Sequence, residues 1–247
     1  SEQRFDYLFI IKEMSTIAVI PARKGSKRIP FKNRRYLSGQ PLLDYTVNAA
    51  LDTPEIDEIY LSTDDKELLD TVKNKQVKKL VRDPSLATDM ANSFDVMINT
   101  VNQLEENGHN RVEFLVMLQI TTPLRDKGLI SKGIQMLKEN HEASCLISVY
   151  LQQKFTGTIH DSFWEPDYPA NPPARSQDME KKYIPSGSLY IYRYDKSLRN
   201  GLGWGPKIFP LIVDANKWVN IDYEEDFTKA EYLLETYQAD FSHLIKS

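Results

Sequence analysis

The sequence predicts an α/β fold in which a mostly parallel central sheet carries helices on both of its faces. Two observations lead to this prediction. Short apolar segments of strand character alternate along the chain with amphipathic segments of helical period, which is typical of a parallel sheet covered by helices. The 247 residues, 41% of them hydrophobic and 27% charged, suffice for one large domain built around a single core.

The individual strands and helices follow from these segments. Apolar runs predict strands at residues 16–20, 59–62, 79–81, 114–118, 143–150, 188–192 and 208–213. Helical periodicity predicts helices at residues 41–51, 65–73, 92–106, 127–137 and 224–237. Helix 92–106 is the most regular of these, and Gly108 stands where a C-terminal cap belongs.

The stretch from about residue 152 to 187 does not follow this alternation. It combines several prolines with Phe155, Phe163 and Trp164, and it shows little periodicity. A long irregular stretch inside a compact domain is usually functional or an interface. We therefore expect an ordered excursion inserted into a domain of residues 14–247. Residues 1–13 are interpreted as an N-terminal extension or an expression remnant outside that domain.

Composition and charge argue against several classes of protein. No window holds the roughly 18 apolar residues of a membrane span, and residues 1–13 lack the features of a signal peptide. The single cysteine, Cys145, cannot form an internal disulfide, so we expect it to be buried in a strand and the protein to be cytoplasmic. The formal net charge of −4 argues against a nucleic-acid partner.

A basic loop directly follows the first predicted strand. Between Pro21 and Arg35 the chain has seven basic residues and no acidic one. Ligands of open α/β sheets bind beyond the carboxyl ends of strands, which makes this loop a candidate binding element and not merely a solvated basic loop. Gly25 would let the backbone approach a phosphate, with Arg23 and Lys32 as charged donors. The spacing matches neither a Walker loop nor a dinucleotide-binding loop.

The loop is similar to the signature loop of the acylneuraminate cytidylyltransferases, the CMP-sialic acid synthetase family. Four further segments resemble that family in the same order along the chain, so that the resemblance covers about residues 17–234. They are Ser62-Thr63-Asp64, Arg82-Asp-Pro-Ser-Leu-Ala-Thr-Asp89 with Ser93 after it, Leu118-Gln-Ile-Thr-Thr-Pro-Leu-Arg125, and Ile221-Asp-Tyr-Glu-Glu-Asp-Phe227.

Position by position, the resemblance implies a nucleotide site and a site for an acidic sugar, in a homodimer whose excursion lends residues to the partner. The nucleotide site would comprise Ala22, Arg23, Gly25, Ser26, Lys32, Asn33, Arg82 and Ser93, with Arg23 and Lys32 at the triphosphate. The sugar site would comprise Gln119, Thr121, Thr122, Arg175, Gln177, Tyr183 and Gly187. Without the resemblance, Arg82 and Asp89 would suggest a surface ion pair, Gln119 an ordinary strand-edge residue, and Tyr183 a core or interface aromatic.

The resemblance also implies a Mg²⁺ ion held by two acidic residues two positions apart near the end of the chain. Asn220 and Asp222 occupy these positions, so one carboxylate is replaced by an amide, which still has a carbonyl oxygen. Because Mg²⁺ is often bound by one or two carboxylates plus substrate phosphates, we expect Asp222 to suffice. Catalysis would depend on Arg23, Lys32 and Asp222. An alternative role for Asp222 is the N-cap of helix 224–237, with Glu225 completing a capping box.

The activity that these features imply is transfer of a cytidylyl group from CTP to a sialic-acid-like 2-keto sugar acid, with release of pyrophosphate. The pair Lys32-Asn33 favours the sialic-type family over the octulosonate enzymes, whose loop generally reads Lys-Pro. The segment beginning at Leu118 favours an N-acetylneuraminate or legionaminate acceptor over pseudaminate. A transferase for a phosphorylated amino sugar and a non-catalytic nucleotide-sugar binding protein are the alternatives. A role in cell-surface glycan or lipopolysaccharide synthesis would follow.

Overall fold

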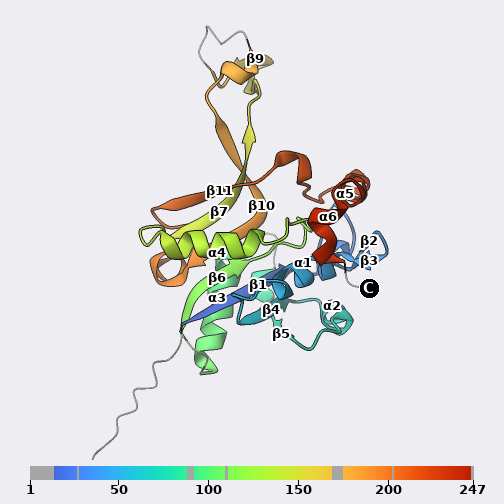
Figure 1. Cartoon of the computed structure of the whole chain (residues 1–247), viewed down its shortest axis with the longest axis vertical. Coiled ribbons are helices and arrows are strands. Elements are labelled where there is room, and N and C mark those ends of the chain that lie inside the picture. Colours follow the sequence, from blue (N-terminus) through green and yellow to red (C-terminus); the bar gives the residue numbers. More distant parts are fainter. Residues whose placement is uncertain are drawn as a thin grey trace, which may run out of the picture.

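A seven-stranded sheet forms the centre of the molecule in the computed structural model (Figure 1). The structure describes residues 14–26, 28–87, 92–108, 111–168, 175–201 and 203–245. Its strand order is β11-β7-β10-β6-β1-β4-β5. The strands are β1 (Ser15–Ala22), β4 (Glu58–Thr63), β5 (Val77–Val81), β6 (Val112–Met117), β7 (Cys145–Gln152), β10 (Lys182–Arg193) and β11 (Ile208–Ile212).

All neighbouring strands of this sheet are parallel except for those beside β10. Strand β1 lies in the middle and pairs in parallel with β4 and β6, and β5 and β11 continue the parallel pairing at the two edges. Strand β10 runs antiparallel to β6 and β7. The mostly parallel sheet predicted from the sequence is therefore confirmed.

Helices cover both faces because alternate residues of β1 point to opposite sides. Ala18 and Ile20 belong to a buried cluster with the helices α1, α2, α4 and α5, whereas Ile17 and Val19 belong to a second cluster with α3. The helices are α1 (Leu42–Leu51), α2 (Lys66–Thr71), α3 (Ser93–Glu106), α4 (Leu129–Glu139), α5 (Glu224–Thr236) and α6 (Gln238–Phe241). No helix in the described ranges has the length and apolar content needed to cross a membrane.

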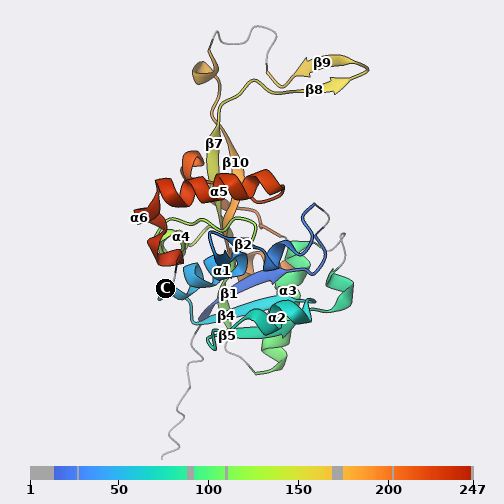
Figure 2. The same ribbon diagram turned by 90° about the vertical axis from the view of Figure 1, so that its right-hand side faces the viewer.

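An arm projects from the sheet where β7 and β10 continue beyond their neighbours (Figures 1 and 2). Its outer part carries a hairpin of β8 (Gly157–His160) and β9 (Phe163–Pro166) and a short 3-10 helix, Ser176–Asp178. The stretch expected to be irregular therefore contains strands. Strand β10 pairs with β7 at residues 182–185 and again at residues 190–192, with a register shift between Pro185 and Tyr190. It therefore begins earlier than the strand predicted at residues 188–192.

The start of α5 corrects one alternative from the sequence. Tyr223 is the N-cap residue, and the carboxylate that caps the helix belongs to Asp226, which accepts from the backbone N–H groups of Asp222 and Tyr223 at 2.8 Å each. The prediction of Asp222 as N-cap with Glu225 in the capping box is therefore wrong by one residue. The Asp222 side chain does not cap the helix, and the backbone N–H of Asp222 is held by Asp226.

Replacing Asp226 tests this cap. Asp226→Ala leaves two backbone N–H groups without their acceptor and should lower the free energy of unfolding by about 1–2 kcal/mol in a urea titration. The matched control is Glu225→Ala at the neighbouring exposed position, which should change stability by less than about 0.5 kcal/mol. Equal losses for the two variants would show that Asp226 is not the cap.

Candidate active site

A cavity of about 360 Å³ opens at the carboxyl end of β1, where open α/β sheets bind their ligands. Its lining comes from the loop after β1, the segments after β5 and β6, the first turns of α3, and the segment before α5. The lining residues are Pro21, Arg23, Gly25, Ser26, Lys32, Asn33, Arg82, Leu86, Ser93, Val96, Gln119, Ile120, Thr121 and Asp222. These include three cationic side chains and one carboxylate, so the cavity is suited to an anionic ligand.

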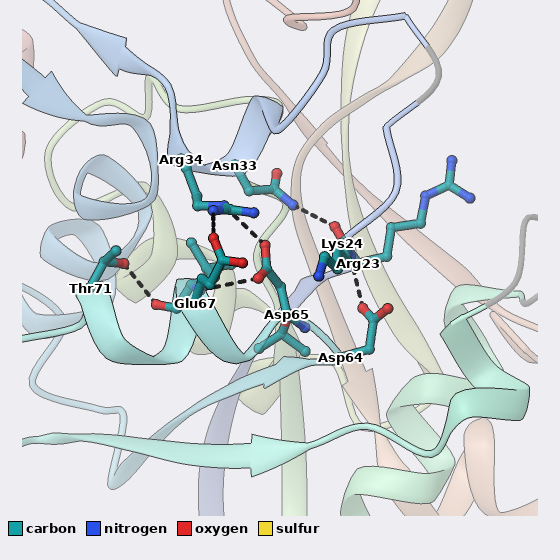
Figure 3. A network of polar contacts seen from close by, with 10 residues as sticks. Arg23, Lys24, Asn33, Arg34, Asp64, Asp65, Glu67 and Thr71 are labelled. Carbon is teal, nitrogen blue, oxygen red and sulfur yellow. Dashed lines mark hydrogen bonds and ion pairs between the residues drawn. The ribbon is translucent and has the colours of Figure 1, made fainter.

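Hydrogen bonds fix the two ends of the basic loop next to each other. The side-chain amide of Asn33 donates to the carbonyl oxygen of Arg23 at 3.0 Å, and the backbone N–H of Lys24 donates to Asp64 Oδ1 at 2.7 Å (Figure 3). Figure 3 also shows the Arg23 side chain extending away from the cluster formed by Arg34, Asp65 and Glu67. Asn33 thus closes the loop through its side chain while it also lines the cavity.

Lys32 joins the loop to the far end of the chain. It is 8% exposed, and its Nζ donates to the carbonyl oxygen of Ile221 at 2.6 Å and to Asp222 Oδ1 at 3.2 Å. The backbone N–H of Ile221 in turn donates to the carbonyl oxygen of Thr121 at 2.7 Å. Three segments that lie far apart in the sequence therefore meet around one ammonium group at the edge of the cavity.

Arg82 is buried in the cavity wall. Its guanidinium donates to the carbonyl oxygen of Ser62 at 2.8 Å, whereas its Nε is buried without a hydrogen-bond partner among the described residues. Burial lowers the pKa of Arg82. The nearby charge of Arg23 lowers this pKa further, whereas the charge of Asp64 raises it. The alternative interpretation of Arg82 as part of a surface ion pair is therefore wrong. Asp89, the partner suggested for that pair, lies outside the described residues. Arg82 thus contributes a buried cation to the cavity wall.

The N-terminus of α3 adds to the positive character of the cavity. Ser93 and Val96, in the first turns of this helix, both line the wall. Asn92 caps the helix through its side chain, which accepts from the backbone N–H of Phe94 at 2.6 Å. The helix dipole places a partial positive charge at this end, so it acts in the same direction as the three cations.

Asp222 is the carboxylate in the cavity lining, and the side chains of three neighbours contact it. Besides Lys32, Arg28 lies with Nη1 3.1 Å from Oδ2, and the side-chain amide of Asn220 donates to Oδ2 at 2.7 Å. Asn220 and Asp222 lie in the segment before α5, outside the sheet, and their side chains are in direct contact. No three or more His, Cys, Asp or Glu side chains within the described ranges gather as a metal-binding group.

Two residues predicted for the sugar site, Gln119 and Thr121, line the cavity, and two others support its wall. Thr122 is buried, and its hydroxyl donates to the carbonyl oxygen of Gly187 at 2.9 Å. Gly187 has a φ of 77°, and a Cβ at this position would lie 2.9 Å from Gln119 Oε1. The absent side chain of Gly187 therefore leaves room for the Gln119 side chain.

The remaining predicted residues lie away from the cavity. Arg175 and Gln177 are on the arm, where the Arg175 guanidinium pairs with Asp178 at 2.8 Å, and Tyr183 is at the start of β10 (Figure 2). Ala22 is buried at the end of β1 and does not contribute to the lining. Within one chain, the structure thus brings the predicted nucleotide residues other than Ala22 together around the cavity, but not the predicted arm residues.

Arg125 is a residue of this region to which the sequence reasoning gave no role. It is 1% exposed, and its guanidinium donates to the carbonyl oxygens of Ser188 at 2.7 Å and Gln119 at 2.8 Å. Burial lowers its pKa to about 9, so it stays charged at neutral pH. Arg125 thereby fixes the backbone that carries Gln119. The sequence feature that could have indicated this role is the position of Arg125 at the end of the Leu118-to-Arg125 segment.

Comparison with known proteins places this geometry in a family. The family model described as "Cytidylyltransferase" matches residues 17–198. The chain is 28% identical over 220 residues to the N-acylneuraminate cytidylyltransferase of Streptococcus agalactiae serotype III, covering 87% of this chain and 52% of that protein. It therefore spans about half the length of that relative. It is 29% identical to the pseudaminic acid cytidylyltransferase of Campylobacter jejuni, with 89% and 96% covered, and 29% identical to the CMP-N,N'-diacetyllegionaminic acid synthase of Legionella pneumophila, with 91% and 98% covered.

Solved structures show the same fold. A CMP:2-keto-3-deoxy-manno-octonic acid synthetase complexed with CTP superposes with a TM-score of 0.65 at 16% identity, covering 90% of this chain and 99% of the other. A 4-diphosphocytidyl-2C-methyl-D-erythritol synthase from Anaerococcus prevotii superposes with a TM-score of 0.61, also at 16% identity and with the same coverage. At this identity the likeness concerns the fold alone.

Proposed function

Because this chain belongs to the cytidylyltransferase family, we propose that it joins CTP to a sialic-acid-like 2-keto sugar acid and releases pyrophosphate. The observation that carries the proposal is the convergence of Arg23, Lys32 and Arg82 on one cavity at the carboxyl end of β1. Such a cavity offers charge-assisted donors to a triphosphate. The names of the N-acylneuraminate, pseudaminic acid and legionaminic acid relatives support the same class of reaction.

The two substrates occupy different parts of the cavity in this proposal. The triphosphate lies against Arg23, Lys32 and the Gly25–Ser26 backbone, and Arg82 in the cavity wall contacts the nucleoside. The acidic sugar lies against Gln119 and Thr121. For in-line transfer, the anomeric hydroxyl would approach the α-phosphorus from the side opposite the leaving pyrophosphate.

The reaction exchanges one phosphorus–oxygen bond for another. The anomeric oxygen forms a bond to the α-phosphorus, and the bond from that phosphorus to the β-phosphate bridging oxygen breaks. The hydroxyl proton passes to solvent. Negative charge accumulates on the departing pyrophosphate, where Arg23 and Lys32 stabilise it. Lys32 is fixed before the reaction, since its side chain is buried and its ammonium is held by Ile221 and Asp222.

Mg²⁺ would be held by Asp222 together with the substrate phosphates. The donor set fits this arrangement, because one carboxylate plus phosphate oxygens is a common Mg²⁺ environment and Asp222 is 34% exposed at its side chain. The Arg28–Asp222 pair is exposed and therefore weak, so it presents little obstacle to a cation. When bound, Mg²⁺ would neutralise phosphate charge. Asn220 would support Asp222 through its amide, and its own carbonyl oxygen as a ligand stays a prediction.

The acceptor is proposed to be of the N-acetylneuraminate or legionaminate type. The pair Lys32-Asn33 and the segment beginning at Leu118 favour this type over octulosonate and pseudaminate. The three named relatives, at 28–29% identity, do not separate the sialic, pseudaminic and legionaminic acceptors. The preference within the family therefore rests on these residues alone, and a role in cell-surface glycan synthesis would follow from it.

We also propose that the protein works as a cytoplasmic homodimer formed through the arm. The arm exposes large apolar side chains, among them Ile159 at 75%, Phe163 at 74% and Trp164 at 53%. Exposed apolar clusters of this kind mark interaction surfaces. A partner's arm would bring Arg175, Gln177 and Tyr183 to the sugar side of the cavity. The buried Cys145 thiol, whose pKa burial raises to about 12, suits a reducing compartment.

Pyrophosphate release tests the proposal directly. The protein is incubated with CTP and Mg²⁺ and with N-acetylneuraminate, legionaminate, pseudaminate or octulosonate in turn. We expect release that depends on both CTP and a sugar acid, and that is highest with the first two sugars. Absence of release with every sugar, alongside intact CTP binding, would favour a non-catalytic nucleotide-sugar binding protein and overturn the proposed activity.

A second experiment concerns the metal. Asn220→Asp places a second carboxylate beside Asp222 and should lower the Mg²⁺ concentration for half-maximal activity by about tenfold, because charged oxygens bind Mg²⁺ more strongly than amide oxygens. Asn216→Asp, on the exposed turn before this segment, is the matched control for the added charge. A Mg²⁺ titration that Asn220→Asp leaves unchanged would remove residue 220 from the metal site.

A further inference from the structure

Two successive carboxylates at the end of β4 fasten the basic loop, and the proposed reaction uses neither of them. Asp64 accepts from the backbone N–H of Lys24 at 2.7 Å, at the start of the loop. Asp65 pairs with Arg34 at the end of the loop, where Asp65 Oδ2 lies 3.1 Å from Arg34 Nε (Figure 3). Strands β4 and β1 are adjacent and in register at Thr63 and Ala22, so these carboxylates emerge directly beside the loop.

Asp65 is held rigidly in place. Its side chain is 3% exposed, its Oδ1 accepts from the backbone N–H of Leu68 as the N-cap of α2, and its own N–H donates to Thr63 Oγ1 at 3.0 Å. The carboxylate that faces Arg34 is thus fixed from both sides. Because it is buried, its attraction for the guanidinium is screened far less than that of an exposed pair.

Arg34 transmits this anchoring to the residues that line the cavity. It is the last residue of a 3-10 helix, Lys32–Arg34, so Lys32 and Asn33 precede it within a single turn. Its guanidinium also packs 4.5 Å from the ring centroid of Phe31, a residue with a φ of 52°. Holding Arg34 therefore sets the orientation of Lys32 and Asn33.

Glu67 is the second acidic partner of Arg34 but contributes less to the anchoring. Its side chain is 66% exposed, whereas that of Asp65 is buried. An exposed ion pair is worth little, because solvent screens it and its side chains must be ordered. The two carboxylates therefore serve as an internal comparison within one cluster.

We propose that Asp65, acting through Arg34, is a positioning residue that holds the described parts of the basic loop, residues 23–26 and 28–34, in the conformation that receives a nucleoside triphosphate. The cations of this loop repel one another, so the loop needs an anchor outside the cavity to stay closed before the ligand arrives. If only a fraction of molecules holds the closed loop, the apparent affinity falls by that fraction. That the ligand is a nucleoside triphosphate rests on the proposed function. That Asp65 orders the loop does not depend on it.

The test uses Asp65→Asn, which keeps the shape of the side chain and, because Asn is as good an N-cap as Asp, keeps the cap of α2. The contact between Arg34 Nε and Asp65 is an ion pair without a hydrogen bond. Asp65→Asn removes the negative charge and therefore removes this ion pair. We expect the dissociation constant for CTP to rise about tenfold and kcat at saturating CTP to change by less than about threefold. Backbone hydrogen exchange in residues 23–34 should become faster. Glu67→Gln is the matched control and should change the CTP affinity by less than about twofold.

A double-mutant cycle separates positioning from a general effect on folding. Arg34→Gln should weaken CTP binding at least as much as Asp65→Asn does, and the double variant should weaken it no further than Arg34→Gln alone, because Asp65 acts through Arg34. Additive losses would contradict the proposal, as would hydrogen exchange in residues 23–34 that Asp65→Asn leaves unchanged. If the wild-type protein fails to bind CTP, the proposed function fails, whereas the hydrogen-exchange comparison still decides whether Asp65 holds the loop.

Discussion

The contact of Lys32 with Ile221 and Asp222 is the interaction on which the candidate site depends. It joins the loop after the first strand to the segment before α5, two parts of the chain separated by almost 190 positions. The same segment bonds to the backbone after β6 through Ile221 and Thr121. Without this meeting point the cavity would lose one wall, and the cation expected to balance phosphate charge would no longer be fixed.

Carboxylates outside the cavity anchor the basic loop that carries two of its cations, Arg23 and Lys32. Asp64 and Asp65 hold the two ends of the basic loop, and Glu224 pairs with Arg35 just beyond it. Arg82 is buried nearby with one unsatisfied donor, and the first turns of α3 face the same space. The loop is therefore ordered by charges on its outer side, while its inner side remains suited to an anionic ligand. This separation of anchoring from binding explains how so many cations coexist in one short segment.

Much of this arrangement could be predicted from the sequence, because it follows from local patterns. Apolar runs and helical periods placed the sheet and its helices, and the position of the basic loop after β1 placed the cavity. The exact capping residue of α5 could not be predicted, because Asp222, Glu225 and Asp226 all offer carboxylates near the helix start. The roles of Arg125 and Asp65 depend on contacts with distant backbone or side chains, which local patterns do not report. The arm hairpin was missed because its turn, at Asp161 and Ser162, lacks the usual glycine.

The central claim is that the loop after β1 binds the triphosphate of CTP, and calorimetric titration tests it most directly. CTP, CMP and cytidine are titrated in turn into the wild-type protein and into Lys32→Gln. The wild type should bind CTP about 10²-fold more tightly than cytidine, since each charge-assisted hydrogen bond to a phosphate contributes about 1.5–3 kcal/mol. In Lys32→Gln, the ratio of the affinity for CTP to the affinity for cytidine should be about tenfold smaller than in the wild type. Equal affinities of the wild-type protein for CTP and cytidine would contradict the claim.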